Sequence, residues 1–193
     1  MFTTSLFEYF SSYIPLRQTE RDALTERVIE KTVRKKGMLL TAGEVCEHYC
    51  FVKSGLLKMY TTDPDGAGHN IQFAAEGDWI TDNSSFHSCQ PSPLNIEALE
   101  KSIVLSIGRK ELIYLFHHFP KFDRIFRVIV ENKYQDLQAR MLQNISFTAD
   151  QRYESFLKSS PALANRLPNT EIASYLGITP EFLSKIRRKL VGK

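Results

Sequence analysis

The 193-residue sequence contains only three cysteines, Cys46, Cys50 and Cys89, and no Cys-x-x-Cys pair. Three thiols cannot all pair with one another, and they cannot supply a four-cysteine zinc or iron–sulfur site within one chain. We therefore expect free thiols that are buried as small apolar side chains, with no metal and no cofactor. The rest of the sequence gives no support for a redox role of these cysteines.

The sequence also has no run of eighteen or more apolar residues, and its first residues lack a basic segment followed by an apolar core. These are the signals of membrane spans and secretory leaders, so we expect a cytoplasmic protein with no membrane partner. Hydrophobic residues make up 42% and charged residues 24% of the chain, as in ordinary globular proteins. The formal net charge is only +3, so nucleic-acid binding would need a local basic patch.

The most informative pattern lies between residues 169 and 190, where two short helical patterns are separated by one glycine. Asn169 or Thr170 can cap the first helix, and Gly177 ends it with the positive φ angle that a tight turn between helices requires. The small Ala173 lies where the two helices would cross. The apolar face of the first helix is Ile172, Ala173 and Leu176.

A second helix is predicted to follow Thr179, which acts as its N-cap, with Pro180 and Glu181 in its first turn. Its inward apolar face is Leu183, Ile186 and Leu190. Its outward face is Glu181, Ser184, Lys185, Arg187, Arg188 and Lys189. Residues 185–193 include five Lys or Arg and no acid, which makes a local basic patch. The pattern is typical of a helix-turn-helix that binds base edges and phosphates in a DNA major groove. The alternative is an ordinary helical hairpin with a solvated charged face.

The N-terminal part of the sequence changes from helical to β-rich character. Apolar residues occur at helical spacing from Leu6 to Ile14, and a second helix is expected from Thr19 to about Glu30. From Thr32 to about Ser106, short β-rich segments are each interrupted by Gly, Pro or Asp, as in the hairpin turn Asp63–Gly66. Such regularly spaced short strands predict a sandwich or roll that closes on itself.

A long helix is predicted from Pro120 to Ile145, because this stretch contains no glycine and no further proline. At 1.5 Å per residue it would be about 39 Å long. An apolar stripe with steps of three and four follows it, and further apolar residues widen the surface in its first half. We expect one face to pack on the roll and another to pair with a second copy in a parallel dimer. The predicted dimerisation residues are Phe122, Phe126, Ile129, Val130, Leu137 and Met141. A helix wholly internal to one chain is the alternative.

The order of a β-roll, a long helix and a C-terminal helix-turn-helix resembles the cyclic-AMP receptor protein / fumarate-nitrate reductase regulator (Crp/Fnr) family of bacterial transcription factors. Residues 49–55, 73–80 and 178–185 carry the most specific similarity. The resemblance implies an α+β protein with an antiparallel sensor β-roll over residues 1–118, a dimerisation helix over 119–146 and a helix-turn-helix domain over 147–193. The β-wing that usually follows the second helix of the helix-turn-helix is not expected here.

The resemblance also implies partners and residue roles. The partners would be double-stranded DNA, a second copy of the chain, RNA polymerase, and an unknown small-molecule effector or none. Glu181 would contact a cytosine amino group, and Lys185 would take the place of a guanine-reading arginine. Thr179 and Ser184 would hold phosphates or the helix start. Pro180 replaces a residue that reads a base in many family members, so the best-known operator of the family is not implied.

The segment that resembles a cyclic-nucleotide pocket departs from the family pattern. Between residues 79 and 96 there is no Lys or Arg, and Ser92 or Pro93 occupies the place of the phosphate-binding arginine. Asp82 could stand in for the glutamate that holds a ribose hydroxyl. Because a phosphate would lack a cationic partner, we do not expect cyclic AMP to bind. The candidate pocket residues are Trp79, Asp82, Ser84, Ser85 and Phe86, whose large members could instead fill the roll.

The same sequence offers residues for three other functions. A cupin-like metal enzyme could use His48, His69 and His87, but no His-x-His pair is present and we predict no enzyme. An iron–sulfur oxygen sensor is not expected, because no cysteine precedes Cys46. A protein-interaction module with a vestigial helix-turn-helix is a further alternative, which the basic face of the last helix disfavours.

Overall fold

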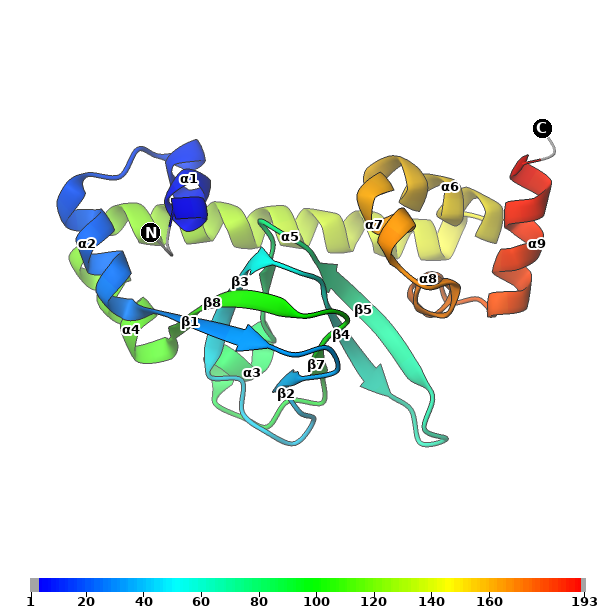
Figure 1. Cartoon of the computed structure of the whole chain (residues 1–193), viewed down its shortest axis with the longest axis horizontal. Coiled ribbons are helices and arrows are strands. Elements are labelled where there is room, and N and C mark those ends of the chain that lie inside the picture. Colours follow the sequence, from blue (N-terminus) through cyan, green and yellow to red (C-terminus); the bar gives the residue numbers. More distant parts are fainter. Residues whose placement is uncertain (1–3, 192–193) are drawn as a thin grey trace. The chain divides into compact units, whose positions relative to one another are not determined.

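The computed structural model describes residues 4–191 of the chain (Figure 1). The chain divides into two compact units. The first holds the chain up to Thr61 together with Gln72–Val130, and the second holds Thr62–Ile71 together with the chain from Glu131 onward. The boundaries that we expect after residues 118 and 146 stay a prediction. Among residues 4–191, no helix is long and apolar enough to cross a membrane.

Two four-stranded sheets form the β-roll (Figure 1). One sheet has the order β1 (Val28–Val33), β8 (Ser102–Gly108), β3 (His48–Ser54) and β6 (Trp79–Ile80). The other has the order β2 (Met38–Leu40), β7 (Asn95–Ala98), β4 (Leu57–Thr62) and β5 (Gly68–Ala74). The pairings of β8 with β1 and β3, and of β7 with β2 and β4, are antiparallel. The antiparallel roll expected from the sequence is therefore confirmed.

The first strand begins earlier than the sequence suggested. We expected a helix to about Glu30, but α2 (Gln18–Arg27) ends at Arg27 and β1 starts at Val28. Val28 pairs with Ile107, and the ladder continues to Val33 opposite Ser102. Because β-branched residues favour strands and pairing with β8 is available, the tertiary partner decides against the helix here.

Helices cover the remaining apolar surface of the first unit. They are α1 (Thr4–Tyr13), α2, the short α3 (Asn83–Ser88), α4 (Arg109–His118) and the first part of α5 (Pro120–Ser146). Phe10 of α1 lies against Phe122 and Phe126 of α5, with ring centroids 5.5 and 5.8 Å apart. The first part of α5 is therefore held inside the unit by aromatic packing.

This packing corrects half of the predicted dimer surface. Phe122, Phe126 and Ile129 are buried within the chain, so they cannot face a second copy. Val130, Leu137 and Met141 are exposed, as a dimer surface would require. We expect one face of the helix to pack on the roll and another face to pair with a second copy. Instead, the predicted residues of its first part are buried and those of its latter part are exposed.

The second unit is mainly helical. It contains the latter part of α5, followed by α6 (Ala149–Ser159), α7 (Pro161–Arg166), α8 (Asn169–Leu176) and α9 (Pro180–Val191), which lie close together in Figure 1. Thr148 caps α6 in a capping box, in which its hydroxyl accepts from the backbone N–H of Gln151 and the Gln151 side chain accepts from the Thr148 N–H. The buried core of the unit includes Tyr153, Phe156, Leu167, Ile172, Ala173, Leu176, Leu183 and Ile186.

The cysteines are free, and they differ in burial. Cys46 and Cys50 are buried as expected, whereas Cys89 is exposed, which corrects the expectation of buried thiols for this residue. Burial raises the pKa of the Cys50 thiol to about 11, so it stays protonated at neutral pH. The thiol of Cys50 lies 3.4 Å from the Ser106 hydroxyl.

Candidate nucleic-acid interface

The turn between α8 and α9 has the geometry of a helix-turn-helix. Gly177 follows α8 with φ 65°, the left-handed conformation that glycine adopts without steric cost. The N–H of Ile178 then donates to the carbonyl of Ala173 at 3.0 Å. Ala173 is fully buried at the point where α8 and α9 meet. A larger side chain there would separate the two helices.

The start of α8 differs from the prediction. Asn169 or Thr170 was expected to cap the helix with its side chain, but Asn169 is the first helical residue. Pro168 takes the N-cap position and makes no side-chain hydrogen bond. Pro168 has the extended backbone conformation of an N-cap residue. The negative charge of Glu171 in the first turn interacts favourably with the positive end of the helix dipole.

The start of α9 follows the prediction closely. The hydroxyl of Thr179 accepts from the N–H of Phe182 at 3.2 Å, and the Thr179 carbonyl accepts from the N–H of Leu183 at 3.0 Å. Thr179 therefore caps the helix. Hydrogen bonds from the Glu181 backbone N–H and from the Thr179 hydroxyl hold the pKa of the Glu181 carboxyl below its usual range. Glu181 is thus an ionised acceptor on the surface at neutral pH.

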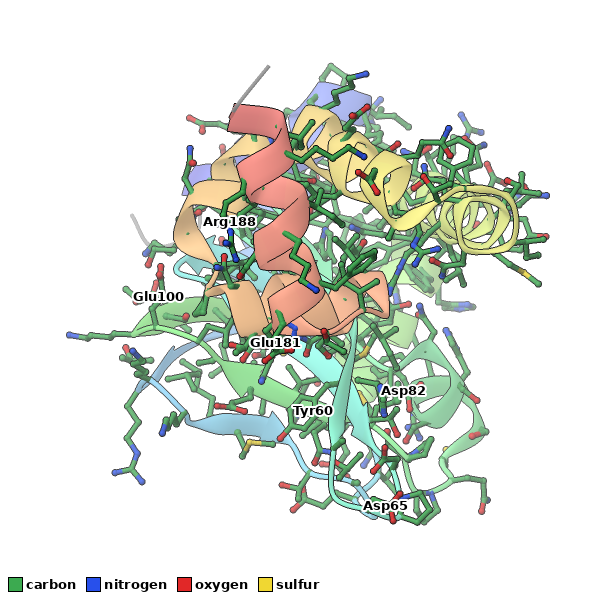
Figure 2. The ribbon with its side chains drawn as sticks, turned by 90° about the vertical axis from the view of Figure 1, so that its right-hand side faces the viewer. Tyr60, Asp65, Asp82, Glu100, Glu181 and Arg188 are labelled. Atoms are coloured by element: carbon green, nitrogen blue, oxygen red, sulfur yellow. The ribbon has the colours of Figure 1, made fainter. Side chains whose placement is uncertain are left out.

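The outward face of α9 carries acceptor and donor groups of different kinds. Glu181, Lys185 and Arg188 are exposed, and Figure 2 shows Glu181 near the start of α9 and Arg188 further along it. The Ser184 hydroxyl donates to the Pro180 carbonyl at 2.9 Å, within the helix. Successive turns of one helix face therefore present a carboxylate, an ammonium and a guanidinium group to solvent.

Two residues assigned to this outward face have partners on α6. Arg187 is partly buried, because its Nε donates to the hydroxyl of Tyr153 at 2.8 Å and its guanidinium lies over the Tyr153 ring. This corrects its placement as a simple outward residue. Lys189 forms a 2.9 Å ion pair with Asp150, although its side chain remains largely exposed. Both contacts fasten α9 to α6.

A polar cluster within the second unit joins the β4–β5 hairpin to α8. The backbone N–H of Asn70 donates to the Ser174 hydroxyl oxygen at 3.0 Å. The side-chain amide nitrogen of Asn70 donates to the backbone carbonyl and the carboxylate of Glu171 at 3.0 and 2.7 Å. The Ser174 hydroxyl donates to the Gly68 carbonyl at 2.8 Å. Asn70 is buried, so these hydrogen bonds satisfy groups that water cannot reach.

Arg140 of α5 completes this cluster. Its guanidinium donates to the carbonyls of Asn70 at 3.1 Å and Tyr175 at 2.9 Å, and also to the carbonyl of Ile71. It stacks on the Tyr175 ring, 3.9 Å from the centroid. Burial lowers the pKa of Arg140 below its usual value, yet guanidinium groups in proteins remain ionised. One planar cation thus ties α5, the hairpin and α8 together.

We predict that Arg140→Ala loosens the hairpin from α8. Three carbonyls would lose their donor. Because a hydrogen bond to a charged group contributes about 1.5–3 kcal/mol, we expect the free energy of unfolding to fall by at least about 2 kcal/mol. Amide hydrogen exchange at Asn70 and Ile71 should become faster. Arg140→Lys, which keeps the charge without the planar fork, should recover only part of the protection. Unchanged exchange in Arg140→Ala would contradict this role.

The predicted ligand-pocket residues of the β-roll are engaged with one another. One carboxylate oxygen of Asp82 accepts from the N–H groups of Ser84 at 3.0 Å and Ser85 at 3.3 Å, and the other accepts from the Ser92 hydroxyl at 2.6 Å. Asp82, which is labelled in Figure 2, is buried. The backbone donors that a phosphate would need are therefore taken by the protein's own carboxylate, and this carboxylate is not available to a ribose hydroxyl.

Aromatic rings fill the space beside this segment. The ring centroid of Trp79 lies 5.3 Å from that of Phe51 and 5.3 Å from that of Phe126. The ring of Tyr49 lies 4.8 Å from that of Phe86. Burial raises the pKa of Tyr49 to about 12, and its hydroxyl donates to the side-chain oxygen of Asn83. Trp79 and Phe86 thus act as core residues.

A cavity of about 400 Å³ lies elsewhere in the roll. It is lined by Lys31, Leu39, Leu40, Glu44, Val45, Cys46, Glu47, His48, Cys50 and Ile96. None of the five predicted pocket residues belongs to this lining. Of the histidines considered for a metal site, His69 instead pairs with Asp63 at 2.9 Å. Across residues 4–191, no three His, Cys, Asp or Glu side chains are grouped so that they could hold a metal ion.

The chain is similar in sequence to a known domain family and to known regulatory proteins. Residues 30–119 match the model of the cyclic nucleotide-binding domain. The anaerobic regulatory protein of Pasteurella multocida is 27% identical over 188 residues, which are 91% of this chain and 68% of that protein. The transcriptional activator protein FnrA of Stutzerimonas stutzeri is 28% identical over 185 residues, which are 90% of this chain and 75% of that protein.

Solved structures show the same fold. FixK2 from Bradyrhizobium japonicum gives a TM-score of 0.74 at 22% identity and covers 86% of this chain and 85% of its own. A CooA variant from Carboxydothermus hydrogenoformans gives a TM-score of 0.72 at 20% identity and covers 98% of this chain and 85% of its own.

Proposed function

We propose that this protein, a member of the Crp/Fnr family of transcription regulators, binds an inverted-repeat DNA site as a homodimer. The observation that carries the proposal is the outward face of α9, where ionised Glu181 lies beside exposed Lys185 and Arg188 in a capped helix-turn-helix. Two such helices in a dimer would enter successive major grooves about 34 Å apart. RNA polymerase as a further partner and a cytoplasmic location follow from the same function.

The residues of α9 have distinct proposed roles. Glu181 accepts a hydrogen bond from a cytosine amino group, and Lys185 donates to a guanine edge. Arg188 contacts phosphate. The hydroxyls of Thr179 and Ser184 bond within the first turn of α9 and hold the helix start. Arg187 and Lys189 serve chiefly to hold α9 on α6, with Lys189 exposed enough to contribute to phosphate binding as well. Pro180 starts the helix and carries no base contact.

The dimer surface is proposed on the latter part of α5. Apolar side chains recur there at steps of three and four and are exposed to solvent in one chain. They are Val130, Tyr134, Leu137, Met141 and Ile145. Such a stripe is the seam of a two-stranded coiled coil, and pairing with the same stripe of a second copy would cover it. Two α9 helices related by this two-fold axis would match an inverted repeat.

Lys185→Ala and Arg188→Ala are expected to separate base reading from phosphate binding. Lys185→Ala should weaken binding to the specific duplex by about 1–3 kcal/mol but change binding to random DNA little. Arg188→Ala should weaken both and make the dependence of log K on log salt shallower by about one unit per lost contact. Fluorescence anisotropy over a salt series measures both quantities. If neither variant changes binding to the selected duplex, α9 does not contact DNA through this face.

We also propose that the β-roll does not respond to cyclic AMP. Asp82 already occupies the backbone donors of α3, and neutral Ser92 is in the place of a cationic phosphate partner. Titration calorimetry with cyclic AMP at millimolar concentration should show no binding heat and no change in DNA affinity. A saturable heat with one site per chain would contradict the proposal. The roll still contains the cavity of about 400 Å³ beside Cys46, His48 and Cys50, and we expect an effector of another class, or none.

A further inference from the structure

The first turn of α9 contains an exposed aromatic ring among polar neighbours. Phe182 is 44% exposed, whereas the next apolar residues of the helix, Leu183 and Ile186, are 0% and 2% exposed. Phe182 precedes Lys185 by three residues, so these two side chains are neighbours on the helix surface. The ring therefore belongs to the surface proposed to face DNA and not to the core of the helix-turn-helix.

The backbone that carries this ring is held by the helix start. The N–H of Phe182 donates to the Thr179 hydroxyl at 3.2 Å, which orders the first turn before any partner binds. In helix-turn-helix proteins, the N-terminal residues of the second helix approach the base edges. A ring carried on this ordered backbone can bury apolar area against DNA without the cost of first ordering the helix start.

The chemistry of the groove determines what such a ring can contact. A phenyl ring has no hydrogen-bond donor or acceptor, so it cannot satisfy the polar edges of guanine, cytosine or adenine. The C5-methyl group of thymine is the apolar group that base pairs present in the major groove. Phosphates, in turn, prefer the cationic neighbours Lys185 and Arg188.

We propose that Phe182 packs on a thymine methyl group and is a specificity-determining residue of the DNA site. This inference rests on the proposed function, because it requires that α9 binds DNA in the major groove. It predicts a thymine in each half-site that no hydrogen-bonding residue of α9 explains.

The test uses the full-length protein and the duplex enriched from a random pool. Each thymine of one half-site is replaced in turn by deoxyuridine, which removes only the methyl group. One replacement should weaken wild-type binding about fourfold, the effect of one buried methyl or methylene group. Phe182→Ala should bind the thymine duplex more weakly and should lose the difference between thymine and deoxyuridine. Its salt dependence should match that of the wild type, since no charge changes.

The outcomes separate this inference from the function on which it rests. If the wild type binds the enriched duplex but no deoxyuridine weakens it, or if Phe182→Ala shows the same thymine preference, the methyl contact is disproved while DNA binding stands. If Phe182→Ala loses affinity while no deoxyuridine replacement weakens the wild type, the ring contacts the sugar–phosphate backbone, and the inference is also overturned. If the wild type binds no duplex, the proposed function fails with it. Circular dichroism of Phe182→Ala checks that the exposed substitution leaves the fold intact.

Discussion

Leu137→Glu is expected to convert the protein from a dimer to a monomer and to remove binding to an inverted repeat. Leu137 is 58% exposed in a single chain, between Tyr134 and Met141 on the same side of α5. Burying a leucine side chain contributes about 1.5–3 kcal/mol, and a symmetric dimer loses two of them. The dimer dissociation constant should therefore rise by a factor of about 10² to 10⁴, and more if the carboxylates are buried unpaired. Sedimentation velocity over a concentration series measures the change.

A matched control is available on the same helix. Gln135 is also exposed, but it lies on the side of α5 away from Leu137. Gln135→Glu introduces the same charge and should leave both the dimer and its DNA affinity unchanged within a factor of about two. A dimeric Leu137→Glu variant, or a monomeric Gln135→Glu variant, would place the dimer surface elsewhere on the chain.

Phe126→Ala is expected to destabilise the first unit strongly without changing dimerisation. The Phe126 side chain is 4% exposed, and its ring lies 5.6 Å from that of Tyr49 and 5.3 Å from that of Phe116. Truncating a buried phenylalanine in such a site costs about 3–5 kcal/mol, because contacts are lost and a cavity remains. Urea unfolding followed by tryptophan fluorescence would report the loss directly, since the single tryptophan, Trp79, packs on this ring.

The control for this prediction is the neighbouring charged residue. Arg127 is exposed and pairs with Asp123 at 3.2 Å one turn away. Arg127→Ala should change the free energy of unfolding by less than about 1 kcal/mol, as exposed ion pairs contribute little. Equal effects of Phe126→Ala and Arg127→Ala would mean that α5 is not held by the aromatic core. A dissociated dimer in folded Phe126→Ala would mean that this residue does reach the partner.

The parts of the fold that depend on local signals could be predicted from the sequence. The positive φ of Gly177, the cap at Thr179 and the buried residues Leu183 and Ile186 all follow from neighbours within one or two helical turns. The strands of the roll were found from their regular interruptions, although their ends were not. The start of β1 at Val28 depends on β8, which lies far away in the sequence.

The parts that depend on distant partners could not be predicted. Nothing near Arg140 in the sequence indicates that its guanidinium would reach the carbonyls of Asn70 and Tyr175. The stripe on α5 is periodic throughout, and only the packing of Phe10 and the roll shows which part is covered. Asp82 was expected to be a possible ligand contact, because a carboxylate in sequence does not reveal which backbone groups it will bind.

The central claim is that a dimer of this chain recognises a specific DNA sequence through α9. The most direct measurement is selection of bound duplexes from a random DNA pool by the purified full-length protein, without added ligand, read by sequencing. We predict enrichment of an inverted repeat whose half-site centres are about one helical turn apart, and loss of that enrichment in Leu137→Glu. A folded wild-type dimer that enriches no sequence, or only an unrepeated one, would contradict it.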